Sequence, residues 1–331
     1  IDEDTVNYTA TMTYDSWQVS WVNPTTMDTH GFYATIFNQG ATVNGTGDGA
    51  LGNHFVDFIP QLPSAIITSY SFSTTSATND FTSEGLDLVP NDQYYQDQWA
   101  HQNSGQAVSY GGSYVGTPDC DTDTNEAWDI STGNSSSTIA ILDTGVSAHS
   151  EFTGRLVGGY NFISNNTNAS DDQGHGTSCA GIAAAKGNNS GGIAGVCWDC
   201  LIMPVKVLDS SGFGDDNGIA NGIQWAADNG ADVISMSLGG GGYVSYTESV
   251  INYATEIGSI VIAASGNDNS GSLSYPSGYE NCISVGALSP CNERKSTSSC
   301  DGENFWGSNY GSGLDFLAPG VRIHTTTMSG G

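Results

Sequence analysis

The chain has 331 residues, including 35 Asp or Glu and only 6 Lys or Arg, and its formal net charge is -29. Such acidity disfavours nucleic acid and anionic membranes as partners and favours cations such as calcium, although it also suits a simply solvated acidic face. No run of about 18 apolar residues is present, which excludes a membrane-spanning helix. With 37% apolar residues, the chain can form one large domain or two ordinary ones.

Residues 1–88 alternate apolar and polar residues over short stretches, as half-buried strands do. This period of two is visible in "NYTATMTY", "WQVSWV" and "GFYATIF", which are separated by turn sequences such as Asn-Gly-Thr-Gly-Asp-Gly at 44–49. No helical periodicity extends over ten residues. We therefore predict a β-rich accessory domain at 1–88, similar to a β-sandwich.

Strands and helices alternate from about residue 137 onwards. Apolar runs begin at 138, 201, 231, 259 and 281, and helical patterns cover 174–185, 215–230 and 246–258. Continuously apolar strands are typical of a sheet covered on both faces. We therefore predict an α/β domain at 89–331, a doubly wound parallel sheet with helices on both faces. Asp215 or Asp216 is expected to cap the second helix, and Gly230 to end it.

Sequons and cysteines suggest a secreted, extracellular glycoprotein, although sequons also arise by chance in an Asn-rich chain. The sequons are at Asn7, Asn44, Asn134, Asn165, Asn168 and Asn188. Of the seven cysteines, Cys291 and Cys300 are predicted to form a disulfide bond. Cys197 and Cys200 could form a disulfide, a redox pair or a metal site, and an extracellular location favours the disulfide. If Cys179 is the unpaired cysteine, Cys120 and Cys282 would pair by elimination.

Three polar residues are expected at the carboxyl edge of the predicted sheet. Asp143 ends one strand, His175 opens a helix, and Asn267 ends another strand. A carboxylate can orient an imidazole, the imidazole can accept a hydroxyl proton, and an amide can donate to an oxyanion. Taken one at a time, the three residues also have plainer interpretations. Asp143 could be one half of an aspartic protease site, His175 a structural histidine and Asn267 a turn residue.

The segments around these residues resemble the subtilisin-like serine proteases, of the thermitase and proteinase K type. "AILDTGV" is similar to the family's catalytic Asp segment, "GHGTSCAGI" to its His segment, "ISMSLGG" to its substrate-binding strand, "AASGN" to its oxyanion segment and "DFLAPGV" to the strand before its nucleophile. The resemblance implies a subtilisin-like peptidase domain at 89–331 that hydrolyses polypeptides. It also implies that Cys179 is unpaired.

The same resemblance implies a role for each site residue. Asp143 would orient His175, His175 would act as the general base, and Asn267 would donate to the oxyanion. An extended substrate would pair with 237–239, beside a pocket for the residue that precedes the scissile bond. The implied substrate-binding residues are Ser237, Leu238, Gly239, Gly240, Ala264, Ser265 and Gly266.

The family's nucleophile segment has no counterpart in residues 1–331. In the family, a Gly-Thr-Ser-Met-Ala-like segment follows "APGV", whereas "RIHTTTMSGG" follows it here. We expect a peptidase domain that is incomplete at its C-terminus and a catalytic serine outside residues 1–331; Ser329 is not a candidate. The alternatives are cleavage of the chain at this point and a catalytically inactive, glycosylated protein that forms an extracellular filament through its N-terminal β domain.

The resemblance also implies a calcium site. "KGNNSGGIAG" is similar to the family's calcium loop, and "PND" and "HSEF" to the segments that supply its carboxylates, with Glu where Asp is usual. Oxygen ligands of this kind suit Ca²⁺. The implied ligands are the side chains of Asp92, Glu151 and Asn189 and backbone oxygens near Lys186, Gly191 and Ile193.

Overall fold

The chain divides into two compact units, Ile1–Glu84 and Gly85–Gly331. The computed structural model describes residues 88–106 and 116–330 in full and, between residues 6 and 74, the backbone of five strands. Within these residues, no helix has both the length and the apolar character needed to cross a lipid bilayer.

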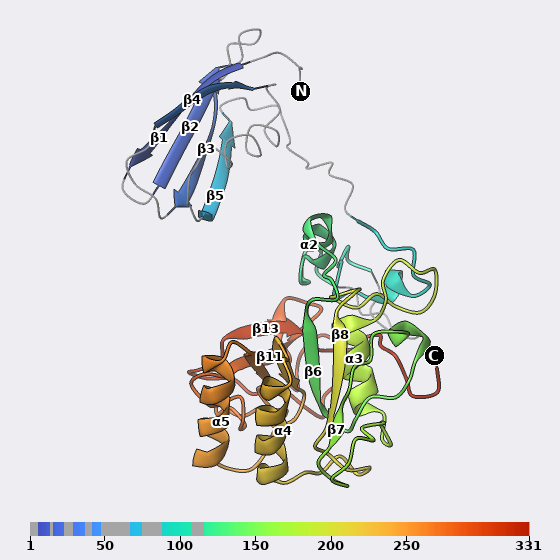
Figure 1. Ribbon diagram of the computed structural model, residues 1–331. Helices are drawn as coiled ribbons and strands as arrows, with labels where there is room; N and C mark the ends of the chain where they lie inside the picture. The colour runs from blue at the N-terminus through green and yellow to red at the C-terminus, as the bar shows by residue number, and fades with distance from the viewer. Residues whose placement is uncertain are drawn as a thin grey trace. The chain divides into compact units, whose positions relative to one another are not determined.

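The five described strands of the N-terminal unit form one antiparallel sheet in the order β4-β1-β2-β3-β5 (Figure 1). They are β1 (Val6–Thr13), β2 (Ser16–Val22), β3 (Thr29–Ile36), β4 (Thr42–Gly47) and β5 (Ile67–Thr74). The prediction of a turn at 44–47 is wrong, because these residues pair with β1. Pairing along a whole strand outweighs the local preference of Asn and Gly for turns.

The second unit contains an eight-stranded, mostly parallel sheet. Its order is β12-β11-β10-β9-β6-β8-β7, with β13 also paired to β11, and β11–β12 is its antiparallel pair. The strands are β6 (Thr138–Asp143), β7 (Tyr160–Asn161), β8 (Leu201–Lys206), β9 (Val233–Met236), β10 (Ile260–Ala264), β11 (Ile283–Ser289), β12 (Glu293–Arg294) and β13 (Phe316–Pro319).

Helices cover both faces of this sheet, as predicted. They are α4 (Asp216–Asp228) and α5 (Ser245–Glu256) on one face and α3 (His175–Ala184) on the other. The helix α2 (Thr124–Ile130) packs instead with Tyr95 and Trp198, and short 3-10 turns lie at Tyr95–Asp97 and Ser150–Phe152. The Asp215 side chain caps α4 by accepting a hydrogen bond from Gly218 N at 3.0 Å, and Gly230 follows the helix with φ +82°.

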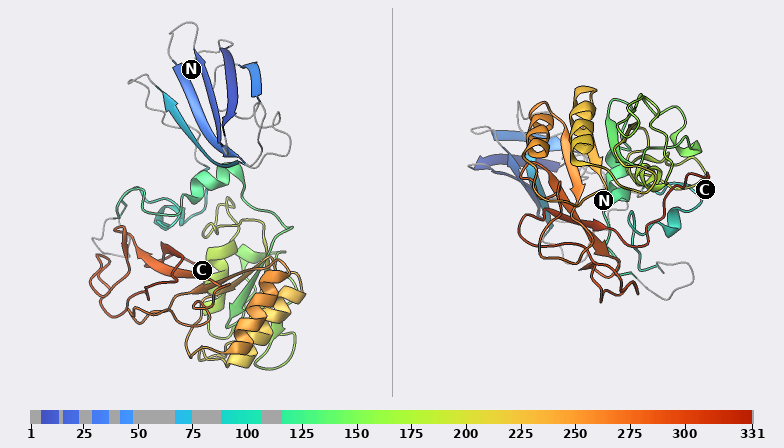
Figure 2. Two further views of the ribbon diagram at one scale, coloured as in Figure 1. Left: turned by 90° about the vertical axis from the view of Figure 1, so that its left-hand side faces the viewer. Right: turned by 90° about the horizontal axis from the view of Figure 1, so that it is seen from below.

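Successive side chains of β6 point to opposite faces of the sheet and pack against the helices there. Leu142 belongs to the core beneath α4 and α5, which lie side by side (Figure 2), whereas Ile141 packs with Ala180 and Ala184 of α3 on the other face. Burying each large aliphatic side chain contributes about 1.5–3 kcal/mol. The packing of α3 against β6 places the start of α3 beside the carboxyl end of β6.

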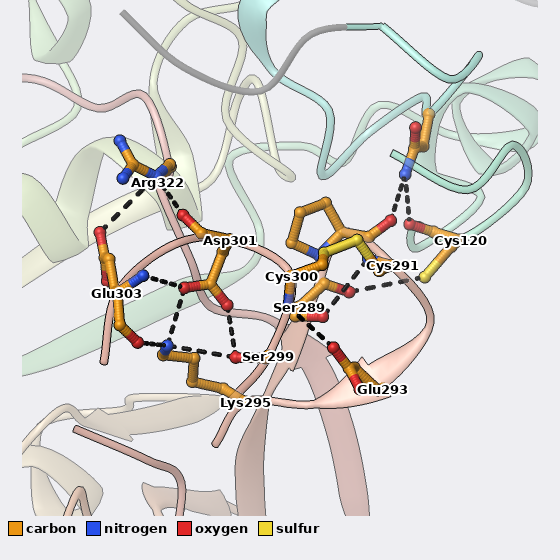
Figure 3. Close-up of a disulfide and its surroundings, with 12 residues drawn as sticks. Cys120, Ser289, Cys291, Glu293, Lys295, Ser299, Cys300, Asp301, Glu303 and Arg322 are labelled. Carbon is orange, nitrogen blue, oxygen red and sulfur yellow. Dashed lines mark hydrogen bonds and ion pairs between the residues drawn. A yellow bond between two sulfur atoms is a disulfide. The ribbon is translucent and has the colours of Figure 1, made fainter. Parts of the chain in front are cut away.

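A buried ion pair lies near the Cys291–Cys300 disulfide (Figure 3). Lys295 Nζ lies 2.7 Å from Asp301 Oδ1, and both side chains are fully buried. Asp301 also accepts a hydrogen bond from Ser299 Oγ at 2.5 Å, while Lys295 N donates to Ala287 O of β11 at 2.8 Å. This network connects the 291–303 loop to the edge of the sheet.

Two predicted disulfides form, and a third pairing is wrong. Cys197–Cys200 and Cys291–Cys300 are bonded, whereas Cys120, Cys179 and Cys282 are free thiols. Cys120 Sγ contacts the carbonyl oxygen of Ser289, the last residue of β11, and Cys282 directly precedes β11. At about 3.3 Å per residue, the strand separates the two thiols by roughly 20 Å, far beyond disulfide reach.

Candidate active site

Asp143 and His175 meet at the carboxyl end of β6. Nδ1 of His175 lies 2.8 Å from Oδ1 and 2.9 Å from Oδ2 of Asp143. The carboxylate is fully buried, whereas 48% of the His175 side chain is exposed. Asp143 Oδ1 also accepts a hydrogen bond from Thr144 N at 2.7 Å, which fixes the carboxylate.

Two glycines allow α3 to begin against the end of β6. Gly174, directly before α3, has φ +114°, a conformation that residues with a Cβ atom rarely adopt. At Gly176, a Cβ atom would overlap the carbonyl oxygen of Gly145 and lie 3.1 Å from Asp143 Cβ. The Gly-His-Gly sequence is therefore required for His175 to reach Asp143.

Asp171 positions both sides of this contact and was not among the predicted site residues. Its buried carboxylate accepts hydrogen bonds from Thr144 Oγ1 at 2.8 Å and from Thr177 Oγ1 at 2.6 Å, and it caps α3 through Gly174 N at 2.9 Å. Burial opposes ionisation, but the hydrogen bonds from Thr177 and Gly174 lower the pKa of Asp171 overall. An acidic residue four positions before His175 is the one sequence signal for this role.

The two ring nitrogens of His175 have different surroundings. Its hydrogen bond to Asp143, and then its contact with Cys179, raise its pKa above the ordinary value of 6.5. Cys179 Sγ lies 3.8 Å from Nδ1. Because Nδ1 faces Asp143 and no described residue hydrogen-bonds to Nε2, the neutral ring presents a lone pair at Nε2. The ring can therefore accept a proton from a group bound beside it.

His175 and Asn267 line a common groove of about 860 Å³. Six of the seven predicted substrate-binding residues also line it: Ser237, Leu238, Gly239, Gly240, Ala264 and Gly266. Ser265 does not, because successive residues of an extended segment point to opposite sides. Its buried hydroxyl contacts Ser308 Oγ and Asn309 O, both at 3.2 Å. The groove is also lined by residues that were not predicted, including Asp216, Asp268, Ser274 and Tyr275.

The predicted calcium ligands include two carboxylates that are buried near each other. Asp92 and Glu151 are 5% and 4% exposed, and burial raises the pKa of both groups. Asp92 Oδ2 accepts a hydrogen bond from Asn188 N at 2.6 Å, whereas Oδ1 is buried without a partner among the described residues. Asn189 Nδ2 donates to Glu151 Oε2 at 2.9 Å. The other predicted ligands are backbone oxygens near Lys186, Gly191 and Ile193, which lie in the same loop as Asn189.

Two buried carboxylates and an unpartnered oxygen suit a hard cation. The four sequons at residues 134–188 are not among the residues that line the groove. Asn134, Asn165, Asn168 and Asn188 are exposed, as a glycosylated residue must be, and the side chains of Asn7 and Asn44 lie outside the described residues.

Comparison with known proteins agrees with this geometry. Residues 134–330 match the subtilase family, so the chain belongs to that family, the subtilisin-like serine proteases. It is 42% identical over 239 residues to thermitase of Thermoactinomyces vulgaris, which covers 72% of this chain and 76% of thermitase. It is 40% identical over 240 residues to the thermophilic serine proteinase of Bacillus sp. (strain AK1), of which it spans about half, 53%.

Solved structures show the same fold. A protease of Pseudoalteromonas arctica PAMC 21717 matches with a TM-score of 0.59 and 32% identity, over 70% of this chain and 72% of that one. A cold-adapted subtilisin-like serine proteinase matches with a TM-score of 0.54 and 30% identity, over 73% of this chain and 77% of that one. The predicted fold class and family are therefore confirmed.

Proposed function

We propose that the protein is a secreted serine endopeptidase in which Asp143, His175 and a serine outside residues 1–331 form a catalytic triad. The observation that carries this proposal is the contact of His175 Nδ1 with a buried carboxylate at 2.8 Å, in a ring whose Nε2 faces no described hydrogen-bond partner. Secretion is supported by the Cys197–Cys200 and Cys291–Cys300 disulfides, which persist in oxidising surroundings.

In this proposal each residue has one chemical task. His175 Nε2 takes the proton of the serine hydroxyl as the serine oxygen bonds to the peptide carbonyl carbon, and then gives that proton to the leaving amine. Asp143 holds the ring and stabilises the imidazolium. The side-chain amide of Asn267 donates a hydrogen bond to the oxyanion. A water molecule then repeats the sequence and releases the acyl group.

The test of the proposed function is hydrolysis of an unfolded polypeptide by the natural, full-length protein. We expect new amino termini to appear with time, and phenylmethylsulfonyl fluoride to stop their appearance, because it sulfonylates the hydroxyl oxygen of activated serines and releases fluoride. Absence of cleavage under conditions in which a known subtilase digests the same polypeptide would overturn the proposal.

We also propose that Asp92, Glu151 and Asn189 hold a calcium ion, with carbonyl oxygens of 186–193. Its contribution would be structural: it would neutralise two buried carboxylates and tie residues 91–92 to the 186–193 loop. Asn189 donates to Glu151 in the structure. Rotation of its amide would instead present its oxygen to the ion.

Removal of calcium is expected to lower the melting temperature by about 5–10 °C, since binding at 100 times Kd adds about 2.7 kcal/mol. The measurement is calorimetry of the natural protein with and without EDTA. The Asp92→Asn variant should start with a lower melting temperature and respond weakly to EDTA. An equal response of variant and wild type would remove Asp92 from the site.

A further inference from the structure

The groove that contains His175 carries negative charge at two separate positions and has no Lys or Arg in its lining. Asp268 directly follows Asn267, and Asp216 begins α4. Both residues are exposed. Asp215, which also lines the groove, differs because its carboxylate caps α4. Apart from His175, the lining of the groove therefore includes no residue that carries a positive charge, and it bears two carboxylates that are available to a ligand.

Asp268 has a fixed backbone and a free carboxylate. Its N–H donates to Asn309 Oδ1 at 2.9 Å, and the residue forms a bridge with Gly307. Within residues 88–106 and 116–330, no hydrogen bond or ion pair engages its carboxylate. An exposed carboxylate held in this way can attract a cation without first losing a partner.

Asp216 faces the groove from another segment. Its Oδ1 would lie 3.7 Å from a Cβ atom at Gly241, just past the end of the 237–240 segment. Its carboxylate likewise has no hydrogen bond or ion pair to any described residue. Asp268 thus follows the 264–266 segment, and Asp216 lies beside the end of the 237–240 segment, so that a carboxylate lies near each segment that flanks the predicted path of the substrate.

Ser274 lines the groove beside both of the segments 237–240 and 264–266. A Cβ atom at Gly239 would lie 3.1 Å from Ser274 Cβ, and one at Gly266 would overlap Ser274 Oγ. Ser274 therefore lies against both glycines. Tyr275 also lines the groove and adds an aromatic residue to it. A Lys or Arg side chain suits such a mixed lining, because its methylene stem packs on apolar groups while its charged end stays in water or pairs with a carboxylate.

We infer that the groove selects cationic polypeptides, with Lys or Arg directly before the scissile bond and its charge near Asp268, and a second basic residue near Asp216. This inference rests on the proposed function, which supplies the position of the scissile bond. The methylene stem lies along the groove beside Ser274 and Tyr275, and the head group pairs with the Asp268 carboxylate. Asp268 is thus a residue that determines specificity.

The test compares quenched-fluorescence peptides that differ only in having Lys or Gln before the scissile bond. For the natural protein at low salt we expect kcat/KM to be about 5-fold higher for Lys, as for an exposed ion pair, and the preference to shrink in 0.5 M NaCl. In Asp268→Asn the ratio should approach one. For Asp216→Asn, a second pair of peptides carries Lys or Gln farther from the scissile bond. In this variant the Lys/Gln ratio of kcat/KM for that pair should also approach one.

The matched control is Glu256→Gln, which removes one negative charge from an exposed position on α5 outside the groove. It should leave the Lys/Gln ratio at the wild-type value. An equal fall of the ratio in Glu256→Gln would show that the overall charge of the protein is responsible, and would overturn the inference. A wild-type preference for Gln would overturn it as well.

A binding experiment separates this inference from the proposed function. The same two peptides, with a reduced, uncleavable bond, are titrated against the protein by fluorescence anisotropy. Tighter binding of the Lys peptide that is lost in Asp268→Asn would support the inference even if no peptide were hydrolysed, and only the proposed function would then fail. Equal binding of the two peptides would overturn the inference whatever the activity.

Discussion

The His175→Ala variant is expected to hydrolyse peptides with kcat about 10⁶-fold below that of the natural protein, because it removes the proposed acceptor of the serine proton. Asp143→Asn should lower kcat by about 10⁴-fold, since an amide cannot hold the ring in the required tautomer. KM should change little in either variant because the predicted substrate-binding residues at 237–240 and 264–266 remain in place. The measurement is steady-state hydrolysis of a quenched-fluorescence peptide.

Two further measurements would show that the variants lose activity because proton transfer is lost and not because they unfold. Far-ultraviolet circular dichroism of both variants should match the natural protein at the assay temperature. Activity of the natural protein should fall as pH is lowered through the raised pKa of His175, because the protonated ring cannot act as a base. A kcat reduced less than 10-fold in His175→Ala would rule out His175 as the base.

Replacing Asp301 with Ala is expected to reduce the free energy of unfolding by about 3–5 kcal/mol, because it leaves the fully buried Lys295 ammonium without its counter-ion. The loss corresponds to about 10 °C in melting temperature for a unit of this size. The measurement is calorimetry at neutral pH. Since buried pairs of charges and apolar pairs are often equally stable, Lys295→Met/Asp301→Leu should recover most of the loss.

The Lys186–Asp199 pair provides the matched control. It has a similar N–O distance, 2.5 Å, but its side chains are 42% and 44% exposed. Removing Asp199 should therefore cost less than about 1 kcal/mol. Equal melting temperatures for Asp301→Ala and Asp199→Ala would contradict the prediction that breaking the buried ion pair costs more free energy than breaking the exposed one.

Sequence patterns located the parallel sheet and the contact between Asp143 and His175 for identifiable physical reasons. Strands covered on both faces are apolar along their whole length, and the carboxyl ends of parallel strands meet at one edge of the sheet. Asp215 and Gly230, at the two ends of α4, were equally visible because caps use few residue types.

Features that depend on the tertiary structure were not visible. Asp171 lies in a polar stretch that reads as a loop, and its role arises only when Thr144 and Thr177 meet around it. The direction in which Ser265 points and the separation of Cys120 from Cys282 depend on the course of single strands. Buried pairs such as Lys295 and Asp301 have the same sequence appearance as exposed ones.

The most direct test of the central claim, that Asp143 and His175 activate a serine, is labelling of the natural protein with a fluorophosphonate probe, followed by peptide mapping. The account predicts one labelled serine per chain, located outside residues 1–331, and loss of the label in His175→Ala. Absence of a label in the intact protein, or a label that persists in His175→Ala, would contradict it.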